Sequence, residues 1–406
     1  MALEKSMLAI LDAVNKMILS STIVSSIVLS SHALSSQIIV NQQKMLEAKA
    51  KSKRKREVAA ETRYADEIKF ISSWKINCGI AIYTEYLLNA MKTVDPNRRY
   101  EVCPIGESPS ESMDVLHLQH EFGLIERFRY NINDFASSKS EKKIITFHTV
   151  TFEREREHKA WCDQADALIV HTVYQKQLLH EMTSKPIHII PHGSVIFTPI
   201  QKNDAREILN LPQDKFIIYI HGFHKQIDDY IDVIKAASEL SGVHLCLLIS
   251  PHFTTITSPE KQKEIKKMQE HISSLKMTDN VTLITKFLTE EEINLYVSAS
   301  DAILFNYRQP EYVASCSGAM HRVLAGGKPI ICTREDSRLD ELIENKHALK
   351  YSYGNINEMQ NCITKLMENP RLAIKLGSYC RKLAFETSWL NIAIKHLNLY
   401  DELLCA

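Results

Sequence analysis

Short apolar runs alternate with amphipathic stretches along the chain from Asp66 onward. The apolar runs are bounded by polar and turn-forming residues, so they predict buried β-strands. In the first half the expected strands are Ile68–Ser72, Tyr100–Pro104, Val115–Gln119, Lys143–His148, Ala167–His171 and Ile187–Pro191. In the second half they are Phe216–His221, His244–Ser250, Val281–Ile284, Ala302–Phe305 and Pro329–Cys332.

The stretches between these runs repeat their apolar residues at helical spacing and predict α-helices. The expected helices are Gly79–Met91, Val173–Glu181, Asp228–Glu239, Ser258–Leu275, Glu290–Ser298 and Ser317–Leu324, followed by a helical tail over 357–404. Alternating strands and helices require parallel sheets with right-handed crossovers. The predicted fold class is therefore α/β.

The strands fall into two sets, joined over Phe197–Asn210, a segment that contains Pro199 and Asp204. A chain of 406 residues also exceeds the size at which a single core keeps growing. We therefore expect two facing Rossmann-like domains, over 63–198 and 199–385, and a C-terminal helix over 386–406 that crosses back to the first domain. Ligands of open α/β sheets bind at the carboxyl ends of the strands, so the cleft between the domains is the expected site.

Residues 1–62 differ in composition from the rest of the chain. No charged residue lies between Lys16 and Lys44, and serine pairs recur there every five residues. Five residues advance a helix by about 140°, so these pairs leave no constant apolar stripe. The stretch is long enough for a bilayer, but its eight serines make it a poor membrane-spanning helix. We expect a helical or disordered extension with a basic run over Lys49–Arg56; the alternative is a peripheral membrane or oligomer contact through residues 1–60.

Charge and cysteine content narrow the range of functions. Lys+Arg and Asp+Glu both number 49, so the chain has no net charge to attract nucleic acid. Its nine cysteines are scattered without a Cys-x2-Cys pair. This pattern indicates reduced thiols in a cytoplasmic protein, with neither zinc sites nor disulfides. No cleavable signal is expected at the N-terminus.

The stretch from Ser317 to Ile331 combines a small-residue helix start with a glycine stop and a buried strand. The first N–H groups of a helix lack partners and carry the positive end of its dipole, so a start uncovered by small side chains suits a phosphate. Ser317, Gly318 and Ala319 are the residues expected to hold that anion. The alternative is an ordinary helix-to-strand connection, in which Ser317-Gly318 is only a cap.

Polar residues also follow the predicted strands of the first domain. Gly79 opens the first helix and lets a ligand approach the backbone. A dinucleotide fingerprint needs three glycines, so a nicotinamide enzyme is excluded. His120 and Glu121 come just after the third strand and His148 ends the fourth, whereas His117 alternates inward and is expected in the core. The spacing of these histidines and carboxylates matches no metal cage.

In the second domain, Lys225 follows a strand and precedes a helix, where its ammonium group could bind a diphosphate. A solvated loop lysine is the alternative. Glu311 follows another strand, after a loop with Arg308, and its carboxylate could accept hydrogen bonds from sugar hydroxyls.

In this order and spacing, the motifs resemble glycosyltransferase family 4, retaining enzymes with the two-domain GT-B architecture. The resemblance extends from about Asp66 to the C-terminus. In the first domain it rests on Asn77–Tyr83, His117–Gly123, Thr146–Thr149, Ala165–His171 and Ile190–Gly193. In the second it rests on Phe287–Ile293, Ala299–Ala302, Ala325–Ile331 and Ser388-Trp389.

The resemblance implies transfer of a hexose from a UDP- or GDP-linked sugar, bound mainly by the second domain, without a metal or other cofactor. The acceptor, bound mainly by the first domain, would be a glycan, a lipid-linked group or a protein. The residues implied in catalysis are His148, Glu311 and Lys225. Those implied in donor binding are Gly79, His224, Lys225, Arg308, Ser317, Gly318, Ala319 and Arg322, and those in acceptor binding are His120 and Glu121.

The chain departs from the family pattern at two places. Arg322 stands where the second glutamate of the Glu-x7-Glu motif usually holds the ribose. The arginine that normally accompanies the phosphate lysine is missing from the loop Gly222–Lys225, so that His224 or Arg308 would have to supply its charge. The alternative hypothesis is therefore a catalytically weakened GT-B scaffold that acts as a binding or partner protein. An epimerase of the same architecture fits the polar residues of the first domain less well.

Overall fold

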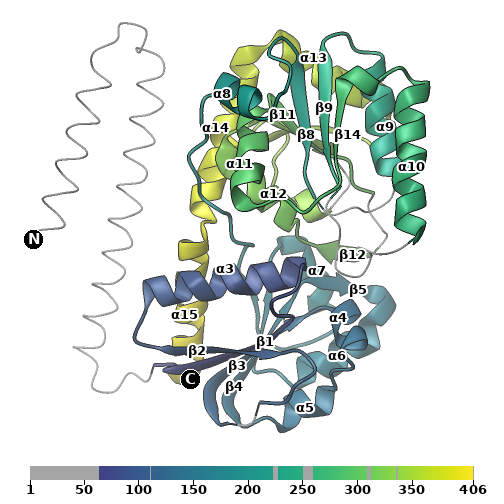
Figure 1. Ribbon diagram of the computed structural model, residues 1–406. Helices are drawn as coiled ribbons and strands as arrows, with labels where there is room; N and C mark the ends of the chain where they lie inside the picture. The colour runs from purple at the N-terminus through teal and green to yellow at the C-terminus, as the bar shows by residue number, and fades with distance from the viewer. Residues whose placement is uncertain are drawn as a thin grey trace, which may run out of the picture. The chain divides into compact units, whose positions relative to one another are not determined.

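The computed structural model describes residues 64–109, 111–222, 227–249, 259–308, 312–334 and 337–405 (Figure 1). The expectations for residues 1–62, including the basic run, lie outside these residues. The described chain contains two large parallel β-sheets, both within one compact unit over 63–406. None of the helices in the described ranges is at once long and apolar enough to cross a bilayer.

The first domain is built on a six-stranded parallel sheet in the order β2-β1-β3-β4-β6-β7. Its strands are β1 (Glu67–Ser72), β2 (Arg99–Pro104), β3 (Met113–His120), β4 (Ser140–Phe147), β6 (Ala167–Val170) and β7 (Ile187–Ile189). The interior strand β6 is buried along its whole length. Such continuous burial is typical of a parallel sheet, because its crossover helices cover both faces.

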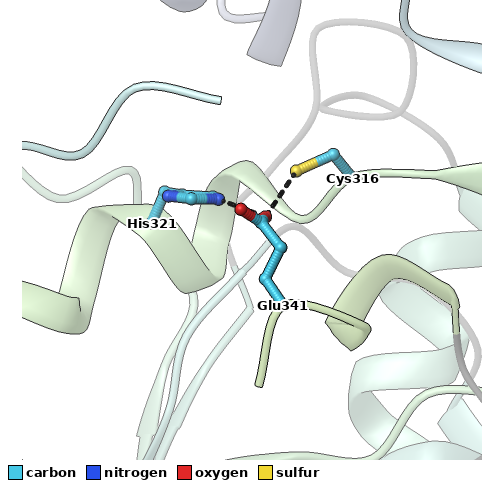
Figure 2. Close-up of side chains that lie close together, drawn as sticks. All are labelled: Cys316, His321 and Glu341. Carbon is cyan, nitrogen blue, oxygen red and sulfur yellow. Dashed lines mark hydrogen bonds and ion pairs between the residues drawn. The ribbon is translucent and has the colours of Figure 1, made fainter. Parts of the chain in front are cut away.

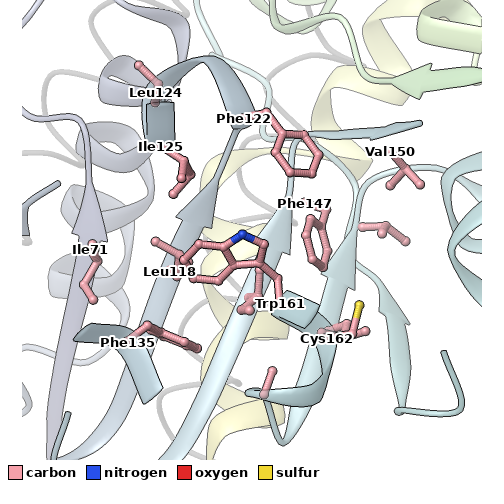
Figure 3. Packing of buried hydrophobic residues seen from close by; sticks show 14 of the residues in the cluster. Ile71, Leu118, Phe122, Leu124, Ile125, Phe135, Phe147, Val150, Trp161 and Cys162 are labelled. Atoms are coloured by element: carbon pink, nitrogen blue, oxygen red, sulfur yellow. The ribbon is translucent and has the colours of Figure 1, made fainter. Parts of the chain in front are cut away.

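Helices cover both faces of this sheet. One face carries α4 (Phe122–Arg127), α5 (Ile132–Ser137), α6 (Glu155–Asp163) and α7 (Val173–His180), and the other carries α3 (Gly79–Val94) and α15 (Trp389–Cys405). Leu118, Phe147 and Trp161 pack together on the first face (Figure 3). Phe70 and Tyr400 belong to the core on the second face.

The second domain repeats this architecture with a six-stranded parallel sheet in the order β10-β9-β8-β11-β13-β14. Its strands are β8 (Phe216–Ile220), β9 (Val243–Leu248), β10 (Val281–Ile284), β11 (Ala302–Phe305), β13 (Ile330–Thr333) and β14 (Ala348–Tyr351). One face is covered by α8 (Lys202–Ile208), α11 (Glu290–Ala299), α12 (Gly318–Val323) and α14 (Pro370–Glu386), and the other by α9 (Ile227–Ser238), α10 (Pro259–Ser274) and α13 (Ile356–Glu368). Single 3-10 turns occupy Phe152–Arg154, Thr278–Asn280, Leu324–Gly326 and Ser337–Leu339.

Each sheet has a point at which the strand order reverses. In the first sheet β1 leads into α3 on one face, whereas β3 leads into α4 on the other. In the second sheet β8 leads into α9 on one face, whereas β11 leads through β12 (Val313–Ser315) into α12 on the other. Because neighbouring connections leave in opposite directions, a crevice opens at the carboxyl ends of each of these strand pairs.

The two domains are joined by more than the covalent linker. Residues 190–201 lead from the first domain to α8, and Thr387-Ser388 lead from α14 back to α15. Where these segments cross, the Ser194 N–H donates to the Thr387 carbonyl over 2.7 Å. The short strand β5 (Thr149–Thr151) of the first domain also pairs antiparallel with β12 of the second. Both contacts hold the carboxyl ends of the two sheets together.

The structure confirms the predicted α/β class with two Rossmann-like sheets, and every strand expected from an apolar run is present. The prediction missed β14 and also β5 and β12, which are three residues each and pair only with one another. The expected helical tail is divided into three helices. One division falls at Pro370, which lacks an N–H and begins α14, while the Asn369 side chain caps that helix.

Candidate functional site

A cavity of about 830 Å³ lies between the two domains. The first domain contributes the β1–α3 connection and one side of α3, including Lys75, Gly79 and Tyr86. The second domain contributes the carboxyl ends of β8 and β11 and the start of α12. The cavity therefore occupies the crevices at which open α/β sheets bind ligands, and its walls come from both domains.

The start of α12 forms part of the cavity wall through Ser317, Gly318 and Ala319. The Ser317 hydroxyl accepts a hydrogen bond of 3.1 Å from the Met320 N–H, as an N-cap does. A Cβ atom on Gly318 would lie only 3.0 Å from Nε2 of His192. The glycine therefore allows α12 and the linker histidine to approach each other closely, a packing role that the sequence did not indicate.

Arg322 also lines the cavity, although 92% of its surface is buried. Its guanidinium forms an ion pair of 2.5 Å with Glu290 and donates a hydrogen bond of 3.1 Å to the side-chain oxygen of Asn294. The Nε and Nη1 atoms have no hydrogen-bond partner within the described part of the chain. A buried guanidinium with unused donors is a strong point of attraction for an anionic ligand, because those donors have given up water without replacing it.

Arg338 is a second arginine in the cavity wall that the sequence did not indicate. Its guanidinium lies 4.3 Å from the ring centroid of Tyr307 and donates a hydrogen bond of 3.0 Å to the Arg308 carbonyl oxygen. Arg308 itself has an exposed side chain and is not among the cavity-lining residues. Arg338, from a 3-10 turn thirty residues further along the chain, thus lines this wall, while the donor-binding role expected of Arg308 stays a prediction.

Lys75 is another cavity-lining cation that the sequence analysis missed. It is exposed and has a φ of 55°, a left-handed backbone conformation that L-residues adopt rarely. This conformation turns the chain sharply between β1 and the start of α3 at Gly79. An unusual backbone conformation beside a cavity is typical of residues positioned for binding.

A group of histidines connects the cavity wall with the interior of the first domain. The rings of His148 and His171 lie 5.1 Å apart, those of His171 and His192 lie 5.8 Å apart, and the ring of His192 stacks on that of His321 at 5.1 Å. Burial, and then the neighbouring histidines, hold the pKa of His148 and of His192 well below the ordinary value. These two imidazoles are therefore neutral and can act as hydrogen-bonding groups but not as cations.

Within this group, His192 lines the cavity and His148 does not. Nε2 of His148 is instead engaged by the Gln119 side-chain oxygen at 2.9 Å. The linker histidine, and not His148, therefore faces the cavity, while the role expected of His148 stays a prediction. The motif Ile190–Gly193 contains His192, but from the sequence it was interpreted only as the beginning of the linker.

The two residues expected to bind the acceptor lie outside the cavity wall. His120 is fully buried among Phe122, Phe147 and Trp161, and neither of its ring nitrogens has a hydrogen-bond partner in the described chain. Glu121 is the N-cap residue of α4, and burial raises the pKa of its carboxyl group. Neither side chain lines the cavity, and the acceptor role expected of them stays a prediction.

Of the remaining predicted residues, Gly79, Ser317, Gly318, Ala319 and Arg322 are brought together around the cavity. His117 lies in the core, as expected, with both ring nitrogens hydrogen-bonded to the hydroxyls of Tyr400 and Thr146. The predictions for His224, Lys225 and Glu311 lie outside the described residues.

Beside the cavity, three side chains of different chemistry converge on one point (Figure 2). Glu341 accepts a hydrogen-bond contact of 2.8 Å from Nε2 of His321 and a longer one of 3.7 Å from the thiol of Cys316. Burial raises the pKa of the Cys316 thiol. Burial alone would also raise the pKa of Glu341, but the contact with His321 outweighs it and lowers that pKa.

Comparisons with known proteins bear on the fold more than on the activity. No protein-family model matches the chain. A curated D-inositol 3-phosphate glycosyltransferase of Mycolicibacterium smegmatis is 25% identical over 174 residues, which is 42% of this chain and 38% of that protein. The chain thus matches well under half of the length of this relative.

Solved structures resemble the chain over most of its length. A sucrose-phosphate synthase from Thermosynechococcus elongatus has a TM-score of 0.68 at 16% identity, covering 83% of this chain and 99% of its own. A glycosyltransferase from Rickettsia africae has a TM-score of 0.66 at 14% identity, covering 84% and 99%. HepE from Anabaena in complex with UDP has a TM-score of 0.64 at 11% identity, covering 82% and 99%. These likenesses show that the chain has the GT-B fold, with two Rossmann-like domains on either side of a cleft.

Proposed function

We propose that this protein is a retaining glycosyltransferase that moves a hexose from a UDP- or GDP-linked sugar to an acceptor. The observation that carries the proposal is the interdomain cavity, which joins the switch points of both sheets and has arginine side chains in its wall. Further support comes from the relatives, whose names include an inositol-phosphate glycosyltransferase and a sucrose-phosphate synthase. HepE, of the same fold, has been solved with UDP and with UDP-glucose.

The donor would occupy the second-domain side of the cavity. The start of α12 at Ser317 offers backbone N–H groups, while Arg322 and Arg338 offer guanidinium groups to the diphosphate. On the basis of the family resemblance, we also propose that Lys225 binds the diphosphate and that Glu311 binds the sugar. Preorganised cations of this kind lower the barrier by stabilising the charge that develops on the leaving diphosphate.

The acceptor would enter from the first-domain side, past Lys75 and Gly79. In the transfer step the bond from the anomeric carbon to the diphosphate oxygen breaks and a bond to the acceptor oxygen forms on the same face of the sugar. The acceptor proton passes to the leaving phosphate oxygen, so the step itself needs no metal or other cofactor. His192, neutral and in the wall, would hold the sugar by hydrogen bonding, the role first expected of His148.

Calorimetric titration of the full-length protein with UDP and GDP tests donor binding. We expect one of the two to bind, and Arg338→Ala to weaken it by about tenfold or more, because hydrogen bonds to charged groups contribute about 1.5–3 kcal/mol each. Arg334→Ala is the matched control: this arginine is exposed outside the cavity and pairs with Glu344. Absence of binding to both nucleotides, or equal affinity in Arg338→Ala and the wild type, would contradict the proposal.

Hydrolysis of a panel of sugar nucleotides tests turnover. Without an acceptor, a transferase hydrolyses its own sugar nucleotide slowly and releases the nucleoside diphosphate. We therefore expect release from one donor of the panel and from few others. The scaffold hypothesis, which the comparisons do not favour, predicts no release from any donor and a stable protein complex that depends on residues 1–60. The peripheral membrane or oligomer contact through residues 1–60 stays a proposal. Deletion of these residues would test it together with the scaffold hypothesis.

A further inference from the structure

Three potential metal ligands of different types meet beside the cavity. Cys316 follows β12, His321 lies in α12, and Glu341 follows the 3-10 turn Ser337–Leu339. Because the ligands come from separate segments, no local spacing motif in the sequence predicts them. Their Sγ, Nε2 and carboxylate oxygen atoms all lie within 4.8 Å of one another, with His321 fully buried (Figure 2). No other group of three histidine, cysteine, aspartate or glutamate ligands this close was found over the described ranges.

Two of the three separations between the ligand atoms are close to those of a zinc site. With bonds of about 2.3 Å to sulfur and about 2.0 Å to nitrogen and oxygen, ligand atoms around a tetrahedral Zn²⁺ lie about 3.3–3.6 Å apart. The separation between Cys316 Sγ and Glu341 Oε2 is 3.7 Å, and that between His321 Nε2 and the same oxygen is 2.8 Å. An ion would need the imidazole and carboxylate to part by roughly half an ångström, which a side-chain rotation can supply.

The other nitrogen of His321 is held as the second ligand shell of a metal site requires. Nδ1 lies 2.8 Å from the hydroxyl oxygen of Ser194, which lies 2.8 Å from that of Thr387. The Thr387 hydroxyl donates its own proton to the Leu383 carbonyl oxygen over 2.8 Å. Ser194 must then donate to Thr387, and His321 Nδ1–H must donate to Ser194. This chain fixes the ring so that Nε2 points at Glu341.

The chemistry of the three ligands indicates which ion would bind. Thiolate sulfur, imidazole nitrogen and carboxylate oxygen are all ligand atoms of Zn²⁺ in proteins. A thiol, an imidazole and a carboxylate together select a borderline-soft ion over magnesium or calcium.

We propose that Cys316, His321 and Glu341 bind one Zn²⁺ ion at the junction of the two domains. The ion displaces the thiol proton of Cys316 and any proton on Nε2, and both protons leave to solvent. Three protein ligands leave a fourth position for water, and Cys316 belongs to the cavity wall. Through Ser194 and Thr387 the ion also braces the two segments that join the domains. The inference does not depend on the proposed sugar transfer.

Zinc binding is tested on the full-length protein after metal is stripped with a chelator. Titration against a chromogenic zinc chelator should give one ion per chain. Cys316→Ser and Glu341→Gln should each weaken binding by at least about tenfold, the scale on which metal-site partners act. Cys103→Ser is the matched control, because this half-exposed thiol lies on β2, outside the cluster. Thermal unfolding of each variant without metal verifies that it is folded.

Cobalt substitution identifies the ligands directly. The Co²⁺ form should show thiolate-to-metal charge-transfer absorption in the near ultraviolet, and Cys316→Ser should lose that band while Cys103→Ser keeps it. A protein that binds less than one ion per chain, or a folded Cys316→Ser variant with wild-type zinc affinity, would overturn the assignment.

Discussion

Gly193 lies against the indole of Trp389, where the chain leaves the first domain. A Cβ atom at this position would be 2.1 Å from Cδ2 of Trp389, far inside van der Waals contact. The indole cannot simply turn away, because it packs edge-on against Tyr83 and stacks on Tyr86. One missing methyl group therefore allows the linker and the returning C-terminal helix to cross.

At this scale we predict that Gly193→Ala destabilises the protein by about 1–3 kcal/mol, the range found for overpacked cores. Urea unfolding monitored by circular dichroism measures the change. The control is Gly123→Ala, since a Cβ on Gly123 would meet no atom within 4 Å and its φ is not positive. If both variants unfold at the wild-type urea concentration, the close approach of Trp389 is not a constraint in solution.

Helix α15 connects the far end of the chain to the first domain, beside α3 (Figure 1). Its Asp401 forms a two-pronged ion pair with the buried Arg98, at 2.7 and 2.8 Å, and accepts a hydrogen bond from the Ala65 N–H. The hydroxyl of the preceding residue, Tyr400, contacts His117 in the core at 2.6 Å. The helix is thus fixed by directional polar contacts in addition to its apolar face.

We predict that Asp401→Ala costs about 2 kcal/mol of stability, because it leaves a buried guanidinium with only Asp95 as its ionic partner. The change should appear in thermal and urea unfolding alike. Glu402→Ala is the neighbouring control, since Glu402 is exposed and surface substitutions change stability by less than about 0.5 kcal/mol. An equally small effect of Asp401→Ala would mean that α15 is held by its apolar contacts alone.

Across the whole molecule, many histidines are buried in the neutral state. Burial holds the pKa of His117 and of His120 well below the ordinary value and lowers that of His158 and of His396 to about 4. His158 also accepts a hydrogen bond from the Thr151 N–H, which only its unprotonated nitrogen can do. In the unfolded chain these imidazoles bind protons near pH 6.5.

Because the unfolded state binds more protons in this range, stability is full above about pH 6.5 and falls as the pH drops toward 4. For His158 alone, the free energy of unfolding falls by about 3 kcal/mol over this pH range. We predict that the free energy of unfolding, measured by urea titration at a series of pH values, declines through this window. His158→Gln should flatten the decline, whereas the exposed His180→Gln should leave it unchanged. A pH-independent stability from 6.5 to 4 would contradict the neutral buried histidines.

Features that rest on local pattern could be predicted from the sequence. The apolar runs identified every strand of both large sheets except β14, because a buried strand must be apolar along its own length. The Ser317 cap and the division into two Rossmann-like sets followed from turn chemistry and alternation in the same way. Of the site, Gly79 and the α12 start were identified because strand ends and helix starts have recognisable signatures.

Features that join distant segments could not be predicted in this way. The pairing of β5 with β12, the position of His192 rather than His148 in the wall, and the cluster of Cys316, His321 and Glu341 each depend on how the two domains meet. Cysteine spacing could not indicate this cluster, because it compares only neighbours along the chain. By itself, then, the sequence determined the sheets, the domains and the strand ends that border the cavity, since periodicity and turn chemistry act over a few residues. Only the tertiary structure decided which side chains meet there, because that depends on packing between segments far apart in the chain.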